Sequence, residues 1–449
     1  MSVKALENAQ LVAISTPDNV GRLMGKRVPV RRWPEIAAEG MPMPSFHLAT
    51  GIENVPATDL AVTGSHTGWR NGLLMPRPET AVSTALEPGT AIVFADVLDL
   101  DGVPVAEAPP AILARQVERL AAHGLRVKVA TELEFYLYRT SYREAHSNDY
   151  RNLEPYYHLR GGHDALVSSV AESFTEPLRA LVAEAGMFVE CTLSESGVGQ
   201  IELNLTPRDP IAAAWQHALF KYLAKGLALR EGMAATFMAK IEGAMPGSSG
   251  HVHIQLTDLD GHGIMGASMD TGADAHGLSP RGAAFLAGVL AHARDFQLLH
   301  MPYHNSFKRL QPNRSAPTNI CWAPENRTVM VRTVGHGANL RLEFRLPGAD
   351  MNPYFSISGL LASGIAGLEA RAPLPAPVTG DAYSAAPEAA APLLRTLGDA
   401  IAAFEDSIVA AEALTPAVHK HLARLARNEW MAELADVTLW EIRRGFERA

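Results

Sequence analysis

Four segments of the chain alternate strictly between apolar and polar residues, a pattern that predicts β-strands with one face in the core. Their apolar positions are Val, Ile, Leu and Phe, whereas their polar positions read Glu-x-Glu, Gln-x-Glu-x-Asn, His-x-His-x-Gln and Arg-x-Glu-x-Arg. The segments are LRVKVATELEFYLY (125–138), GQIELNL (199–205), HVHIQL (251–256) and RLEFRL (341–346). Taken singly, each could be a strand with an ordinary solvated face. Four polar faces built from such residue types favour one shared site.

The chain before and after residue 105 differs in its predicted secondary structure. The first hundred residues read as short strands separated by Pro, Gly and Asn, and Leu11–Ser15 and Ala91–Val97 are the clearest of them. From Ala106 onward, strands alternate with helical patterns over residues 112–120, 164–186 and 213–233. The pattern predicts an α+β protein, with a small β-rich domain over residues 1–105 and a large α/β domain over residues 106–449.

Composition narrows the class of protein. The 449 residues carry 39 Lys and Arg against 48 Asp and Glu, a formal charge of −9, which argues against binding nucleic acid or an anionic membrane. The longest apolar run, residues 357–368, is shorter than the about 20 residues of a membrane span, and no signal peptide is visible. Two cysteines are too few for a disulfide framework. We expect a cytoplasmic protein.

The polar strand faces bring carboxylates together if the strands are neighbours. Such a cluster either takes up protons or holds divalent cations. Carboxylates with imidazole and without thiolates favour Mg²⁺ or Mn²⁺. Guanidinium groups beside divalent cations recognise carboxylates and transferring phosphoryl groups, and five arginines crowd into one stretch of the chain: Arg309, Arg327, Arg332, Arg341 and Arg345. The residues indicate metal-assisted phosphoryl transfer to an anionic substrate, with a solvated arginine patch as the alternative.

Six motifs resemble the glutamine synthetase family in the family's own order over nearly the whole chain. They are TELEFYLY (131–138), GQIELNL (199–205), GHVHIQL (250–256), NSFKRLQP (305–312), NRTVMVR (326–332) and RLEFRLPGADMNPY (341–354). The resemblance implies an N-terminal β-grasp-like domain and a large catalytic α/β domain. It also implies a homo-oligomer, a dodecamer of two hexameric rings with active sites at subunit interfaces. In the family, ATP phosphorylates glutamate to γ-glutamyl phosphate, and an amine then displaces phosphate.

The resemblance assigns a role to each matching residue. The ligands of one metal would be Glu134, Glu195 and Glu202, and those of a second metal Glu132, His251 and Glu343. The ATP contacts would be His253, Arg332 and Arg341. The groups that hold glutamate and stabilise the transferring phosphoryl group would be Gly247, Arg309, Arg327 and Arg345, with Glu134 also beside the substrate.

Two departures from the family's pattern concern the acceptor. The family binds ammonium with an aspartate in a DGSS-type segment, but this chain has TGSHTGW with Thr63 at that position. The flap glutamate of PGYEAP is replaced by Ser315 in PNRSAP. Neither hydroxyl carries the negative charge that attracts ammonium. The smaller side chains would leave room for a carbon-bearing amine, and Trp69 is a further candidate for the acceptor pocket.

The pattern resembles the γ-glutamyl-amide branch of the family. We expect an ATP-dependent ligase that joins the γ-carboxyl of glutamate to a small organic amine, either an alkylamine, aniline, ethanolamine or polyamine. Two alternatives stay open: a glutamine synthetase that uses ammonia, and a catalytically silent homologue with a structural or regulatory role.

Overall fold

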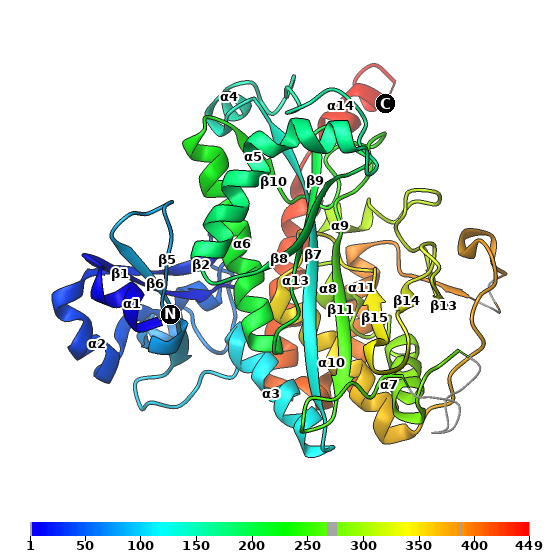
Figure 1. Ribbon diagram of the computed structural model, residues 1–449, viewed down its shortest axis with the longest axis horizontal. Helices are drawn as coiled ribbons and strands as arrows, with labels where there is room; N and C mark the ends of the chain where they lie inside the picture. Colours follow the sequence, from blue (N-terminus) through cyan, green and yellow to red (C-terminus); the bar gives the residue numbers. More distant parts are fainter. Residues whose placement is uncertain (1, 267–275, 387, 389, 449) are drawn as a thin grey trace.

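A computed structural model describes residues 2–266, 276–386, 388 and 390–448. Figure 1 shows a small blue N-terminal unit at one side of a larger body, in which long strands run through the centre. Within the described residues, the small unit holds a six-stranded sheet of order β2–β1–β6–β4–β3, with β5 on β6 and β1 parallel to β6. Its elements are α1 (Ser2–Glu7), β1 (Leu11–Pro17), β2 (Leu23–Pro29), α2 (Trp33–Glu39), β3 (Met41–Pro44), β4 (Asn71–Pro76), β5 (Val82–Ser83) and β6 (Thr90–Leu98).

The larger unit is built on an eight-stranded sheet of order β13–β14–β15–β11–β7–β9–β8, with β10 on β7, counted over the described residues. Its strands are β7 (Arg126–Tyr138), β8 (Val189–Ser194), β9 (Gln200–Leu205), β10 (Ala234–Thr236), β11 (Gly250–Thr257), β13 (Trp322–Pro324), β14 (Val331–Val334) and β15 (Arg341–Phe344). A separate short pair is formed by β12 (Asn319–Ile320) and β16 (Ala391–Pro392). The four alternating segments of the sequence are therefore β7, β9, β11 and β15, side by side in one sheet.

Some helices of the larger unit cover the apolar face of its sheet. The helices that lie between β7 and β11 in the chain are α4 (Tyr142–Ser147), α5 (Ala165–Glu184) and α6 (Pro210–Arg230). The others are α3 (Pro109–Ala122), α7 (Pro280–Ala291), α8 (Gln297–His300), α9 (His304–Phe307), α10 (Pro353–Ala370), α11 (Leu397–Asp406), α12 (Ile408–Leu414), α13 (Pro416–Ala435) and α14 (Leu439–Gly445). The α5 helix begins where expected, because the Asp164 carboxylate accepts from the backbone N–H groups of Leu166 and Val167, at 2.8 and 3.3 Å.

The buried apolar residues form two main clusters under the sheet. One packs Val252, Ile254 and Phe344 of β11 and β15 against α3, α7 and α10. The other packs Phe135 of β7 and Leu203 of β9 against α5 and α6. Since side chains alternate across a strand, burying these residues turns every polar position of the four strands to the opposite face. Hydrophobic burial is thus what gathers the charged groups.

The α+β class and the mixed sheets agree with the prediction from the sequence. The division at residue 105 stays a prediction. No helix in the described part of the chain is long and apolar enough to cross a membrane. The two cysteines, Cys191 and Cys321, are both free.

Candidate active site

The strand register places the predicted carboxylates opposite one another. Glu132 of β7 pairs with His251 of β11, and Glu134 pairs with Glu202 of β9. One step further along the sheet, His253 pairs with Glu343 of β15. Directly opposed residues in an antiparallel pair project to the same face. The sheet therefore converts four sequence motifs into one continuous polar surface.

A cavity of about 340 Å³ lies over this surface. Of the residues predicted from the sequence, those that line it are Glu132, Glu134, Glu195, Glu202, Gly247, His251, Arg309, Ser315, Arg327 and Arg345. Both acids and arginines line it, so the cavity suits an anionic substrate beside cations.

Three carboxylates stand close enough to compete for protons. Ligand oxygens of Glu132, Glu134 and Glu202 all lie within 4.8 Å of one another. Burial and the charges of Glu132, Glu134 and Glu195 raise the pKa of Glu202 to about 10. Burial and the charge of Glu195 raise the pKa of Glu134 to about 7. A divalent cation would relieve this repulsion, so the donor set fits a hard metal ion.

A second group of possible ligands adjoins the first. Atoms of Glu132, His251 and Glu343 lie within 4.8 Å of one another, with His251 Nδ1 at 2.7 Å from Glu132 Oε1 and 3.4 Å from Glu343 Oε1. Burial and the charge of Arg345 lower the pKa of His251 to about 4, so its imidazole is neutral at pH 7. Within the described residues, His251 Nε2 is buried and has no hydrogen-bond partner. Neutral imidazole is the form that binds metals.

Glu343 connects the acids to the arginines. Its two carboxylate oxygens accept from Arg332 Nε and Arg345 Nη1. Burial would raise the pKa of Glu343, but His251 and Arg345 lower it to about 2. Next to this group, His253 Nε2 lies 3.3 Å from Glu132 Oε2, and Arg341 Nε lies 3.4 Å from His253 Nδ1. The three predicted ATP contacts, His253, Arg332 and Arg341, thus lie together beside the cluster.

The predicted glutamate-side arginine Arg309 is deeply buried. It donates to the backbone carbonyls of Leu346 and Arg345, at 2.9 and 3.2 Å, and burial lowers its pKa to about 10. Gly247 packs directly on it, because a Cβ atom at this position would come within 2.7 Å of Arg309 Cγ and of the Ala239 carbonyl oxygen. A glycine is required here for close approach of the loop to the arginine.

Two predicted acceptor residues lie away from the cavity within this chain. Thr63 is fully buried in the N-terminal unit, where its hydroxyl lies 2.6 Å from the Ser45 hydroxyl. Trp69 is 37% exposed, and its backbone has a left-handed φ of 52°. Neither lines the cavity, whereas Ser315 does.

The cavity is also lined by residues whose role the sequence motifs did not indicate. They are Arg160, His163, Ser196, Pro246, Ser249, Asn313 and Arg314. Most of them lie in loops, where strand alternation gives no signal. His163 and Asn313 have positive φ angles of 72° and 60°, which periodicity cannot predict.

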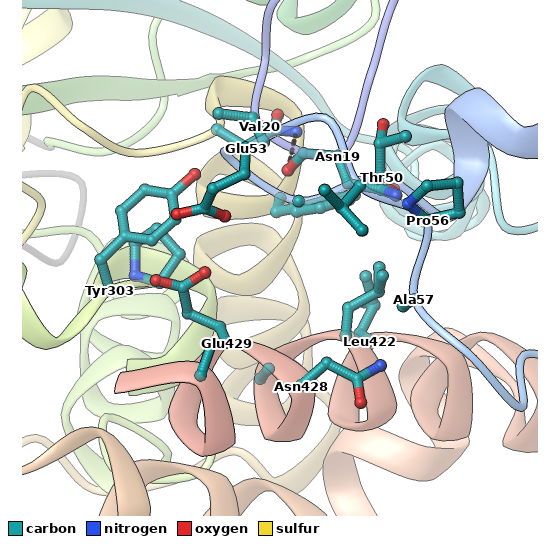
Figure 2. Close-up of a pocket in the computed structure, with 18 of the residues that line it drawn as sticks. Asn19, Val20, Thr50, Glu53, Pro56, Ala57, Tyr303, Leu422, Asn428 and Glu429 are labelled. Atoms are coloured by element: carbon teal, nitrogen blue, oxygen red, sulfur yellow. Dashed lines mark hydrogen bonds between the residues drawn. The ribbon is translucent and has the colours of Figure 1, made fainter. Parts of the chain in front are cut away.

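A second cavity of about 340 Å³ lies elsewhere, between the segment 50–58, α13 and Tyr303. Figure 2 shows Glu53 and Glu429 pointing toward one another there, near the Tyr303 ring. Burial together with Glu53 and Glu433 raises the pKa of Glu429 to about 7. Its walls contain none of the polar strand residues, so the candidate active site is the cavity over the large sheet.

The fold and the site define a class: a two-sheet α+β protein with a carboxylate–imidazole cluster and converging arginines. Comparison with known proteins identifies the family. Residues 106–445 match the glutamine synthetase catalytic domain. The chain belongs to the glutamine synthetase family.

Within this family, the chain is similar to two named relatives and to one solved structure. The chain is 38% identical over 438 residues to the gamma-glutamylethanolamide synthetase GlnA4 of Streptomyces coelicolor, covering 97% of this chain and 92% of the relative. It is 33% identical over 398 residues to a glutamate–isopropylamine ligase of a Pseudomonas species, covering 88% and 82%. The structure of a GmaS–ADP complex superposes with a TM-score of 0.86 at 27% identity, over 99% of both chains. The family resemblance predicted from the sequence is confirmed.

Proposed function

We propose that the protein is an ATP-dependent ligase that joins the γ-carboxyl of glutamate to a small organic amine, releasing ADP and phosphate. The observation that supports this most directly is the contrast between the two halves of the site. The carboxylates, imidazole and arginines of the phosphoryl-transfer half lie together, whereas the two acceptor positions are Thr63 and Ser315 rather than acids. The names of the two relatives point the same way, since both describe amide synthesis from an organic amine.

The proposed roles follow from the neighbours of each side chain. Glu134, Glu195 and Glu202 would hold one divalent cation, and Glu132, His251 and Glu343 another, Mg²⁺ or Mn²⁺. When bound, these ions would offset phosphate repulsion and polarise the reacting oxygens. The ATP phosphates would lie against His253, Arg332 and Arg341. The glutamate would lie against Gly247, Arg309, Arg327 and Arg345.

The chemistry then needs two displacements. The γ-carboxylate oxygen of glutamate attacks the terminal phosphorus of ATP. The bond from this phosphorus to the bridging oxygen breaks, and ADP leaves with its electron pair. The amine nitrogen next attacks the acyl carbon, phosphate leaves, and the nitrogen gives up a proton. Arg345 and Arg327 would stabilise the charge on the moving phosphoryl group, because fixed guanidinium groups in a secluded site need no reorganisation during the reaction.

The cavity walls favour an amine with a single positive charge. All four carboxylates that line the cavity belong to the proposed metal sites. The other charged side chains that line it include Arg160, Arg314 and Arg327. A second ammonium group, as in a polyamine, would meet guanidinium groups there. The acceptor wall would be completed by the N-terminal unit of a neighbouring subunit in a ring-shaped oligomer. Trp69, which is 37% exposed and does not line the cavity of its own chain, would contact the amine there, whereas the fully buried Thr63 would lie behind that wall.

The test is phosphate release from ATP with glutamate and a panel of acceptors: ammonium, isopropylamine, ethanolamine, aniline and putrescine. A monoamine should support turnover and give the γ-glutamyl amide by mass spectrometry, and Glu134→Ala should give neither. Efficient turnover with ammonium alone would instead identify a glutamine synthetase. Absence of turnover with every acceptor, together with absence of metal binding, would identify a silent homologue.

A further inference from the structure

We infer that Gln200 is a positioning residue that holds the metal-binding carboxylate of Glu134 and the substrate loop at Gly247 in one fixed arrangement. The inference rests on the proposed function for the roles of Glu134 and Gly247. Gln200 itself is not a lining residue of the cavity, and no role in the reaction follows from the family motifs quoted above.

The Gln200 side chain is fully buried at the first position of β9 and makes three hydrogen bonds. Its Nε2 donates to Glu134 Oε2 at 3.0 Å and to the Gly247 carbonyl at 3.1 Å. Its Oε1 accepts from the Gly197 backbone N–H at 2.9 Å. One amide therefore touches β7, the loop before β11 and the loop that carries Glu195, which are three separate walls of the site.

Only an amide satisfies all three contacts. The partners require two donors on one atom and an acceptor on the other, which is the arrangement that a carboxamide provides. A carboxylate at this position would place a negative charge against the Glu134 carboxylate and a carbonyl oxygen. The backbone is adapted to the amide as well, because a Cβ at Gly197 would come within 2.6 Å of Gln200 Oε1 and 2.1 Å of Tyr136 Oη.

The amide also determines which oxygen of Glu134 is available. A carboxylate offers about four lone-pair positions. Two on Oε2 are used by Gln200 Nε2 and by the Ser249 backbone N–H at 2.8 Å, and one on Oε1 is used by the Ser249 hydroxyl at 2.6 Å. A single lone pair, on Oε1, remains for a cation. Loss of Gln200 would leave the carboxylate held by Ser249 alone and the Gly247 loop untied from it, and such supporting contacts commonly change metal affinity 10- to 100-fold.

The test compares Gln200→Met with Gln116→Met in the full-length protein. Met keeps the length of the side chain and removes its hydrogen bonds. Gln116 is the matched control, since it is also fully buried and donates to a single backbone carbonyl, that of Ala413, at 2.9 Å. Binding of Mn²⁺ alone is measured by calorimetry, without turnover, and KM for glutamate and kcat are measured separately.

We expect Gln200→Met to bind Mn²⁺ at least about 10-fold more weakly and to raise KM for glutamate, because both tethers are lost. Gln116→Met should change neither quantity. Equal Mn²⁺ affinity in the two variants would overturn the positioning role. So would an unfolded Gln200→Met beside a folded Gln116→Met, since Gln200 would then serve stability alone. Failure of the wild-type protein to bind Mn²⁺ would instead overturn the proposed metal sites.

Discussion

Replacing Glu202 with Gln is expected to stabilise the metal-free protein while removing a proposed metal ligand. Glu202 is buried among Glu132, Glu134 and Glu195, and burial with these charges raises its pKa to about 10. A carboxyl whose pKa is higher in the folded state binds more protons there than in the unfolded chain. It therefore costs stability increasingly as pH rises from 4.5, its unfolded value, to about 10. Gln has no proton to lose and avoids this cost.

The magnitude follows from the displaced pKa. The cost of keeping Glu202 protonated in the folded state grows with the distance of the pH from its unfolded pKa of 4.5. This distance is 1.5 pH units at pH 6 and 3.5 pH units at pH 8. At about 1.4 kcal/mol per unit, the stabilisation by Glu202→Gln is about 2 kcal/mol at pH 6 and about 5 kcal/mol at pH 8.

The assay is urea unfolding in EDTA at both pH values. Glu343→Gln serves as the opposite control, because the pKa of Glu343 is lowered to about 2. This variant should lose stability, and by the same amount at pH 6 and pH 8, since both pH values lie above the unfolded pKa and the carboxylate loses its contacts with Arg332 and Arg345 at both. A stabilisation by Glu202→Gln that does not grow with pH would refute the raised pKa of Glu202. Added Mn²⁺ should stabilise the wild type more than Glu202→Gln.

Three further outcomes are expected. Ser315→Glu should raise kcat/KM for ammonium relative to isopropylamine by about 10-fold or more, because it restores an anion at the acceptor wall; an unchanged ratio would place residue 315 outside that wall. Glu134→Ala should lower glutamate-dependent phosphate release at least about 100-fold, and wild-type turnover would refute its metal role. Burial lowers the pKa of His421 to about 4, so stability should fall as pH drops from 6.5 to 5, by about 2 kcal/mol from this residue, and His421→Leu should lessen that fall in urea unfolding.

The strand faces were predictable because alternation is a local property. Glu132 and Glu134 share a face by their spacing alone, and hydrophobic burial of their neighbours decides which face it is. That Glu134 lies opposite Glu202 is a matter of register between distant strands. Local patterning does not give this register, so the residue types of the polar faces favoured one shared site without indicating which residues pair across the strands.

Loop residues escaped prediction for a different reason. Arg160 and His163 line the cavity from a segment with no periodic pattern, and the left-handed backbone of His163 depends on contacts made only in the folded protein. Gln200 was visible on a polar strand face, yet its three partners come from separate parts of the chain. Nothing in its immediate neighbours along the sequence indicates a tether.

The backbone contacts around Ser315 would let the proposed acceptor residues change while the proposed phosphoryl-transfer residues are kept. Ser315 has a left-handed φ of 57°, and its backbone carbonyl accepts from Arg345 Nη2 at 3.1 Å. The next residue is held in the same way, since the Tyr383 hydroxyl donates to the Ala316 carbonyl at 3.1 Å. Both contacts use main-chain oxygens, so they do not depend on the side chain at position 315. An acid can therefore be exchanged for a serine there without releasing Arg345, which also pairs with Glu343. Under the proposed roles of Ser315 and Arg345, the choice of amine and the transfer of phosphate would thus be separable at this point of the chain.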